Sequence, residues 1–220
     1  MITIKNLTKL YGQTSVLNQI NLHISQNKIT FIMGKNGAGK TTLFKCLLGL
    51  EKFEGEILFN GSDLNHNRKH IYAVFDDSPL YLNLNGYQNI KLLLLNSVSE
   101  SKIKEVSNKF LNQNLLKKKV KTYSYGQRKK LSLIIGILSE PRYLLLDEIS
   151  NGLDFETMRS LQKELKELAK NTTIVTTGHQ FEFYESIIDE LFILNDSHII
   201  QIDYTKSGGA LSDLYSKHIN

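Results

Sequence analysis

The chain has 220 residues, of which 41% are hydrophobic and 22% are charged, and its formal net charge is +5. This length can build a core without covalent staples, and the single cysteine, Cys46, excludes an internal disulfide and suits a reducing compartment. No apolar run approaches the ~18 residues that a membrane-spanning helix needs. The small positive charge is typical of a solvated surface, so we expect no nucleic-acid partner.

The first 75 residues contain patterns typical of three strands, one helix and two more strands, and a turn separates the last two strands. In chain order we expect strands at Ile2–Leu7, Val16–Ile24 and Ile29–Met33, a helix from about Lys40 to Leu50, a strand at Glu56–Phe59 that ends in the Asn60-Gly61 turn, and a strand at Ile71–Phe75.

The spacing of apolar residues then becomes helical from about Gln88 to Leu138, which indicates an inserted helical subdomain. Downstream we expect a buried strand at Leu144–Leu146, an amphipathic helix at Phe155–Ala169, a strand at Thr173–Thr177, and a hairpin of Leu191–Leu194 with His198–Ile202. This alternation predicts an α/β domain with a mostly parallel core sheet.

Residues 34–41 carry a complete G-x-x-x-x-G-K-[ST] phosphate loop between an apolar strand and a helix, which is the context that the motif requires. Backbone N–H groups of such a loop point at phosphate oxygens, and the helix N-terminus adds to the attraction. Lys40 would reach the β- and γ-phosphates, and Thr41 would hold Mg²⁺. Without a nucleotide, we expect the Lys40 ammonium to be solvated. The alternative is a Gly-rich turn with no ligand. The predicted nucleotide-binding residues are Gly34, Lys35, Asn36, Gly37, Ala38, Gly39, Lys40, Thr41 and Thr42.

An apolar run at Tyr143–Leu146 ends in two acids, Asp147 and Glu148. This pattern is typical of a central strand with carboxylates at its C-terminal edge, where ligand sites of open α/β sheets lie. Asp147 would hold Mg²⁺ through water, and Glu148 would accept a proton from an attacking water or orient it. Many buried strands end in an acid, but beside a phosphate loop the pair is expected to be a Walker B element.

Residues 123–130 read Tyr-Ser-Tyr-Gly-Gln-Arg-Lys-Lys, which resembles the signature motif of the ATP-binding cassette (ABC) family, L-S-G-G-Q followed by basic residues. Ser124, Gly126 and Gln127 match the motif, whereas Tyr125 replaces its first glycine and Tyr123 its leucine. Gly126 lies 21 residues before Asp147, as in the family. Ser124 is expected to cap the helix that follows, and an ordinary N-cap is the structural alternative.

With these motifs, the chain from residue 1 to about 203 resembles the ATPase cassette of an ABC transporter. The resemblance implies a phosphate-loop NTPase fold with a RecA-like core, an antiparallel β subdomain and an inserted helical subdomain. The implied single domain divides into a core at residues 1–80 and 138–204, a helical subdomain with the signature at 81–137, and a C-terminal tail at 205–220.

The resemblance also implies roles for single residues. Tyr11 matches the aromatic residue that stacks on adenine, and Asp154 ends the segment that matches the D-loop. His179, which follows Glu148 by 31 residues, matches the switch histidine that contacts the γ-phosphate. Glu148, His179 and Lys40 are thus the predicted catalytic residues. The predicted nucleotide contacts from the second half of the chain are Ser124, Gly126, Gln127 and Asp154.

The chain departs from the family after the strand at Ile71–Phe75, where glutamine is usual. Aligning on residues 80–84 places Asp76 there, with Asp77 beside it. We expect Asp76 to bind Mg²⁺ through water, together with Thr41 and Asp147. An acidic residue at this position resembles the cassettes of bacterial peptide-antibiotic and bacteriocin exporters, and a divergent cassette with a generic loop is the alternative.

The function that the resemblance implies is ATP hydrolysis, with ATP and Mg²⁺ as cofactors, that powers a separately encoded membrane subunit, in the export direction. The implied partners are this transmembrane permease and a second cassette, paired head to tail as a homodimer or a heterodimer. The implied location is cytoplasmic, on the inner face of the cell membrane through the permease. The alternative is a regulatory ABC ATPase with no transport role. The sequence does not identify the substrate.

Overall fold

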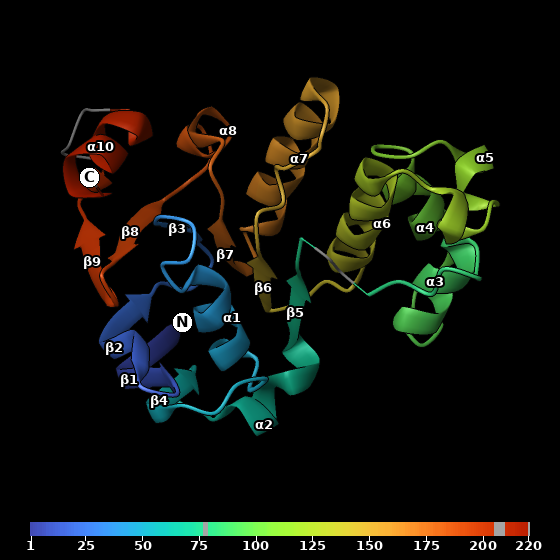
Figure 1. Cartoon of the computed structure of the whole chain (residues 1–220). Coiled ribbons are helices and arrows are strands. Elements are labelled where there is room, and N and C mark those ends of the chain that lie inside the picture. Colours follow the sequence, from blue (N-terminus) through green and yellow to red (C-terminus); the bar gives the residue numbers. More distant parts are fainter. Residues whose placement is uncertain (77–78, 205–209, 220) are drawn as a thin grey trace.

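The computed structural model describes residues 1–76, 79–204 and 210–219, which include two β-sheets with helices around them and further helices to one side (Figure 1). The six-stranded sheet has the order β5-β6-β7-β3-β8-β9, in which the first five strands run parallel and β9 pairs antiparallel with β8. Its strands are β3 (Ile29–Met33), β5 (Ile71–Val74), β6 (Tyr143–Leu146), β7 (Thr173–Thr177), β8 (Glu190–Asn195) and β9 (His198–Ile202). The antiparallel three-stranded sheet, of order β2-β1-β4, comprises β1 (Ile2–Tyr11), β2 (Thr14–Ile24) and β4 (Glu54–Phe59).

Alternate residues of the central strands enter two separate cores. Ile32, Leu145 and Val175 pack on the side of the three-stranded sheet and the helix α1 (Lys40–Leu47). Their neighbours in the strands, such as Phe31 and Leu146, pack on the other side. The strands β3, β6 and β7 are buried on both faces, which agrees with the near-continuous apolar runs of β3 and β6, whereas β7 buries three threonines.

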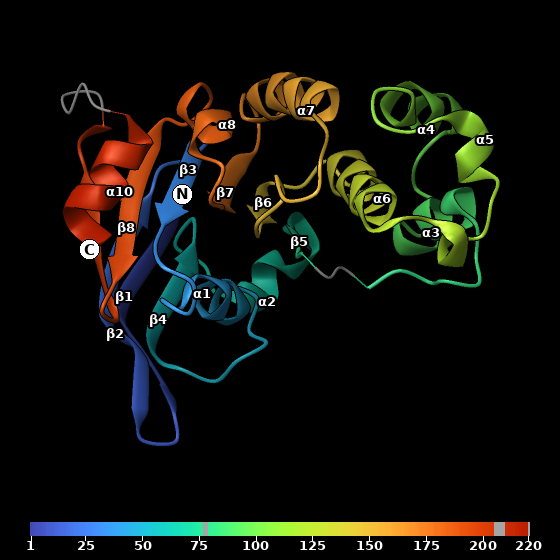
Figure 2. The same ribbon diagram turned by 45° about the horizontal axis from the view of Figure 1, so that its top comes forward.

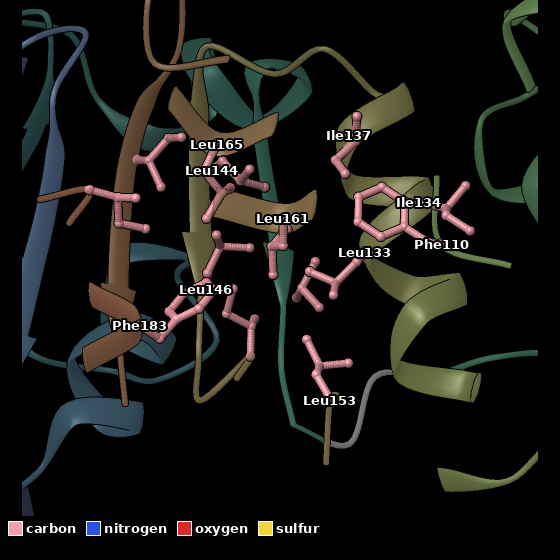
Figure 3. Packing of buried hydrophobic residues seen from close by; sticks show 14 of the residues in the cluster. Phe110, Leu133, Ile134, Ile137, Leu144, Leu146, Leu153, Leu161, Leu165 and Phe183 are labelled. Carbon is pink, nitrogen blue, oxygen red and sulfur yellow. The ribbon is translucent and has the colours of Figure 1, made fainter. Parts of the chain in front are cut away.

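The second core continues from the sheet into the helical subdomain. Figure 3 shows Leu144 and Leu146 of β6 and Leu161 and Leu165 of α7 (Phe155–Leu168) in the same region as the α6 side chains Leu133, Ile134 and Ile137. The helix α6 (Tyr125–Leu138) therefore belongs to the subdomain in sequence but packs on the core. At its C-terminal half, a Cβ added to Gly136 would lie 3.0 Å from Val74 Cγ2, so the helix lies close against β5.

The remaining helices of the subdomain lie to one side of the sheet, beyond α6 (Figure 2). They are α3 (Gly86–Leu93), α4 (Glu100–Ser107) and α5 (Gln113–Leu116). The sequence patterns did not predict three short helices outside the subdomain: α2 (Leu64–Asn67), α8 (Phe181–Glu185) and α10 (Leu211–Ile219). The helix α10 lies in the predicted tail and buries Leu211 and Ile219. Residues 205–209 and 220 of that tail, and Asp77, lie outside the described residues.

The strand predictions are confirmed, with β3, β7 and β9 at their expected bounds. The first helix ends at Leu47, earlier than the expected Leu50. Gly49 has a φ of 65°, and the N–H groups of Gly49 and Leu50 donate to the carbonyls of Cys46 and Lys45. This pattern is a Schellman motif, which closes the helix three residues before the apolar pattern ends. Across the described part of the chain, none of the helices combines the length and apolar character needed to cross a membrane.

Candidate nucleotide site at the ends of the central strands

The phosphate loop connects β3 to the N-terminus of α1, and close packing fixes its course. Gly37 and Gly39 have φ values of 82° and 105°, a region that favours glycine. A Cβ on Gly39 would lie 2.9 Å from Val16 Cγ1, and a Cβ on Gly34 would lie 2.4 Å from the carbonyl oxygen of Leu194. The loop residues between them, at 35–37, are exposed. The loop is therefore held at its glycines and open at its tip, where the first turn of α1 can receive an anion.

Lys40 is buried, with 5% of its surface exposed, so the expectation of a solvated ammonium is wrong. Its Nζ donates to the carbonyl oxygens of Gly34 and Lys35, at 2.8 and 3.0 Å. Burial lowers the pKa of Lys40, and the nearby carboxylates of Glu148 and Asp147 only partly offset this effect. A phosphate would restore the favourable environment that this cation lacks.

Thr41 and Asp147, from α1 and the end of β6, meet directly. The Thr41 hydroxyl donates to Asp147 Oδ2 at 2.7 Å, and the Thr177 hydroxyl donates to Oδ1 at 2.6 Å. Hydroxyl and carboxylate oxygens are the donor set that Mg²⁺ prefers, so these residues fit such an ion. In the described ranges, no group of three or more His, Cys, Asp or Glu side chains is placed so that it could hold a metal ion.

Glu148 borders the same pocket, a hollow of about 350 Å³ that phosphate-loop residues line. Its backbone has a φ of 50°, uncommon for a residue with a side chain. Asn151 Nδ2 donates to Glu148 Oε2 at 2.9 Å, and His179 Nε2 lies 3.4 Å from Oε1, within ion-pair distance but without hydrogen-bond alignment. Among the described residues this buried Nε2 has no hydrogen-bond partner. An unsatisfied ring nitrogen next to Glu148, which lines the pocket, fits contact with a phosphate oxygen.

The signature residues form the N-terminus of α6. Ser124 Oγ accepts from Gln127 N at 3.3 Å, and Gln127 Oε1 accepts from Ser124 N at 3.0 Å, which is a capping box and confirms the predicted cap. A Cβ on Gly126 would lie 2.8 Å from the Gly152 carbonyl oxygen, so the motif packs on the segment between β6 and α7. Asp154 caps α7 through Thr157 N at 2.9 Å.

Comparison with known proteins identifies the family to which this chain belongs. The model of the ABC transporter family matches residues 17–151. The lantibiotic transport ATP-binding protein SrtF of Streptococcus pyogenes is 34% identical over 226 residues, which cover 100% of this chain and 97% of that protein. The chain belongs to the ABC transporter family. It is an ABC ATPase, a subunit that binds and hydrolyses ATP for a transporter, and these relatives favour that role over a cassette without transport.

Further similarities agree with this assignment. The bacitracin transport ATP-binding protein BcrA of Enterococcus faecalis is 34% identical, over 91% of this chain and 68% of that protein. A solved structure of the ATP-binding subunit of an ABC transporter has a TM-score of 0.88 at 23% identity, over 99% of this chain and 98% of that one. The dimeric cassette MJ0796 bound to ADP and Pi has a TM-score of 0.80 at 23% identity, over 92% and 98% of the two chains. The two structures show that the fold is that of an ABC ATPase.

Asp76 has partners in this ABC ATPase that the sequence analysis did not foresee. Its Oδ1 accepts hydrogen bonds from the Tyr125 hydroxyl and from Lys129 Nζ, both on α6. Burial raises the pKa of Asp76, but these two donors outweigh it and hold the pKa below its usual value. Lys129 was not singled out from the sequence, although Tyr125 and Lys129 are spaced i,i+4 and thus share one face of a helix. Metal binding by Asp76 stays a prediction, and it competes with these contacts.

Tyr11 lies at the end of β1, with its ring partly exposed. Lys9 Nζ is 4.5 Å from the ring centroid, a cation–π contact. An exposed aromatic ring of this ABC ATPase can stack on a base, so adenine binding by Tyr11 stays a prediction.

Proposed function

We propose that this ABC ATPase powers the export of a peptide antibiotic of the lantibiotic type through a separately encoded membrane subunit. The observation that carries the proposal is the similarity to SrtF along the whole of both chains, since SrtF is named as a lantibiotic transport protein. BcrA, named for bacitracin transport, supports the same substrate class. The acidic residue at position 76 agrees with it.

The proposed chemistry follows from the charges around the pocket. Lys40 and the loop amides would neutralise the β- and γ-phosphates, because electrostatic stabilisation is the main catalytic contribution in phosphoryl transfer. Thr41 and Asp147 would hold Mg²⁺, which when bound neutralises charge on the same phosphate oxygens. Glu148 would take the proton of a water whose oxygen attacks the γ-phosphorus, while the bond to the β-phosphate oxygen breaks and ADP leaves. His179 would donate to the γ-phosphate.

We further propose that two cassettes assemble head to tail, so that Ser124, Gly126, Gln127 and Asp154 of one chain serve the nucleotide of the other. These residues lie at the start of α6 and of α7, at some distance in sequence from the phosphate loop that they would face in a second copy. The dimeric cassette of the same fold supports this arrangement.

The partner in the membrane would dock on the helical subdomain, near residues 83–91. Large apolar side chains are exposed around this stretch, and they are Tyr81, Leu82, Leu92 and Leu95. An exposed group of this kind marks an interaction surface. Through this contact the subunit would sit on the cytoplasmic face of the cell membrane.

The test is transport in inside-out membrane vesicles that contain this chain and a co-expressed candidate membrane subunit, identified by its co-purification with the chain. We expect ATP- and Mg²⁺-dependent accumulation of a lantibiotic such as nisin, and no accumulation with Glu148→Gln. Some curated relatives, such as PotA of Legionella pneumophila at 32% identity, are named for spermidine and putrescine import. ATP-dependent polyamine movement out of such vesicles, with no peptide movement into them, would overturn the export proposal.

A further inference from the structure

A polar cluster of Asp76, Tyr125 and Lys129 joins α6 to the edge of the core sheet. Lys129 Nζ donates to Asp76 Oδ1 and, at 2.5 Å, to the carbonyl oxygen of Glu148. The Tyr125 hydroxyl donates to the same Asp76 oxygen, and the Lys129 ammonium lies 5.6 Å from the Tyr125 ring centroid. The Lys129 cation thus connects Asp76, two residues after the end of β5, with the Glu148 backbone and the first two turns of α6.

The two charged members of the cluster differ in exposure, since Lys129 is buried and Asp76 is about half exposed. The Lys129 side chain is only 1% exposed, whereas that of Asp76 is 47% exposed. A buried ammonium without a charged partner is costly, and here Asp76 and the Glu148 carbonyl oxygen compensate the Lys129 charge. The Tyr125 ring also fixes this face of α6, since a Cβ on Gly152 would lie 2.9 Å from it.

The contact with Glu148 matters because this residue has an unfavourable backbone conformation. A φ of 50° in a residue with a side chain persists only where the surroundings hold it. The N–H group of Glu148 donates to Thr177 Oγ1 at 3.2 Å, and its carbonyl accepts from Lys129 at 2.5 Å and from the Asn151 N–H group at 3.3 Å. One backbone anchor therefore comes from the core strand β7, and the shorter of the two bonds to the carbonyl comes from α6, the helix that carries the signature motif.

We propose that Lys129 is a positioning residue that sets the direction of the Glu148 carboxylate through the Glu148 carbonyl, with Asp76 and Tyr125 holding the ammonium in place. A shift of the helical subdomain then changes the geometry at Glu148 without any change at the phosphate loop. Asp76 acts in this cluster as the anchor of Lys129 and not as a magnesium ligand. The inference rests on the proposed role of Glu148 in orienting the attacking water.

The experiment compares Lys129→Met and Lys129→Arg with Arg128→Met, which removes a charge from an exposed neighbour on the same helix. In the full-length chain without nucleotide, hydrogen–deuterium exchange should rise in Lys129→Met at residues 147–153 and stay unchanged at 34–41. The kcat for ATP should fall about tenfold to a hundredfold, as a small misplacement of a catalytic group does. The Kd for ATP should stay within about threefold of wild type, and Lys129→Arg should recover part of the rate. Arg128→Met should match the wild type.

A second pair of variants decides the role of Asp76 and covers the case in which Lys129→Met does not fold. Asp76→Asn and Tyr125→Phe should shift the exchange and the rate in the same direction but less, and Asp76→Asn should add nothing in the Lys129→Met background. An additive loss with a higher Mg²⁺ requirement would assign Asp76 to the metal and overturn its anchoring role.

The remaining outcomes separate the inference about Lys129 from the proposed chemistry at Glu148. Unchanged exchange at 147–153 and an unchanged kcat in Lys129→Met would overturn the inference. So would equal losses in kcat and ATP affinity with faster exchange along the whole chain, because these indicate a general packing role. A wild type that hydrolyses no ATP would instead contradict the proposed chemistry, and the exchange measurement would still test the anchor.

Discussion

Two buried lysines, Lys40 and Lys129, lie near Glu148, and they differ in what compensates their charge. Lys40 lines the same pocket as the Glu148 side chain and donates only to two loop carbonyls, without a carboxylate within ion-pair distance in the described part of the chain. Lys129 donates to the Glu148 carbonyl and has the Asp76 carboxylate beside it. The first cation faces an open hollow, and the second is enclosed by the protein.

The difference indicates which cation awaits a ligand. A buried charge without an ionic partner is costly, and a protein keeps it where a ligand of opposite charge binds. Lys40 meets this description, because burial lowers its pKa and the pocket beside it is open. Lys129 has its counter-charge within the chain, so its position is structural and its effect on the chemistry is indirect. Glu148 contacts the first region with its side chain and the second with its backbone.

The largest effect is expected from Glu148→Gln. This variant changes the side chain of Glu148 in the pocket that Lys40 also lines, and it leaves the Glu148 carbonyl hydrogen-bonded to Lys129. The amide keeps the shape but cannot accept a proton, so ATP hydrolysis should fall by roughly 10²- to 10⁴-fold, the contribution of a general base. ATP binding should persist. Phosphate release and a nucleotide-binding titration measure the two properties, and wild-type turnover in the variant would remove Glu148 from its proposed role.

A smaller effect is expected from Lys40→Ala, which tests whether this cation is reserved for the ligand. The loss of a charged hydrogen bond, about 1.5–3 kcal/mol, should weaken ATP binding by roughly ten- to a hundredfold. The melting temperature without nucleotide should not fall, since the variant removes a desolvated charge. Lys129→Met should behave in the opposite way, with retained binding and a lower melting temperature. Equal ATP affinities of Lys40→Ala and wild type in calorimetry would contradict this contrast.

The sequence predicted the Lys40 region well because its geometry is local. A strand, a Gly-rich turn and a helix occupy consecutive residues, and Asp147 and Glu148 follow a strand whose parallel neighbours bring their ends to the same edge. The family resemblance added the ABC fold, which the comparisons confirm, and the role of the signature, which stays a prediction apart from the helix cap at Ser124. The burial of Lys40 was missed because the pattern gives the path of the loop but not which groups cover its lysine.

The Lys129 region could not be predicted in the same way. Lys129 and Asp76 are 53 residues apart, and their contact depends on how α6 lies on the core. No local pattern encodes this arrangement, which follows from packing between Gly136 and β5 and across the second core. Position 76 was therefore assigned from the family's usual role at that position. The substitutions Tyr125 and Asp76, which looked like independent departures, share a hydrogen bond in the structure.

The smallest effect is expected at Lys130, which follows Lys129 on α6. Like Lys129, it forms an ion pair with an aspartate, but this pair with Asp154 is more exposed to solvent. The Lys130 Nζ lies 2.6 Å from Asp154 Oδ2, and the Asp154 side chain is 57% exposed. Hydrogen bonds from Lys130 and from the backbone of Thr157 lower the pKa of Asp154. A carboxylate whose pKa is lower in the folded state stabilises the fold above its unfolded pKa of about 3.9, and this contribution is lost as the pH falls toward the folded value.

Asp154→Asn keeps an N-cap residue on α7 but removes the charge, so it isolates this contribution. We expect wild type to be more stable than the variant at pH 7 by less than about 1 kcal/mol, because exposed ion pairs contribute little. The difference should shrink between pH 4 and pH 2 in urea unfolding. In a Lys130→Met background the pH-dependent part should be smaller, since only the Thr157 hydrogen bonds then favour the carboxylate. A difference that stays constant from pH 7 to pH 2 would mean that the exposed pair does not act through charge, in contrast to Lys40 and Lys129.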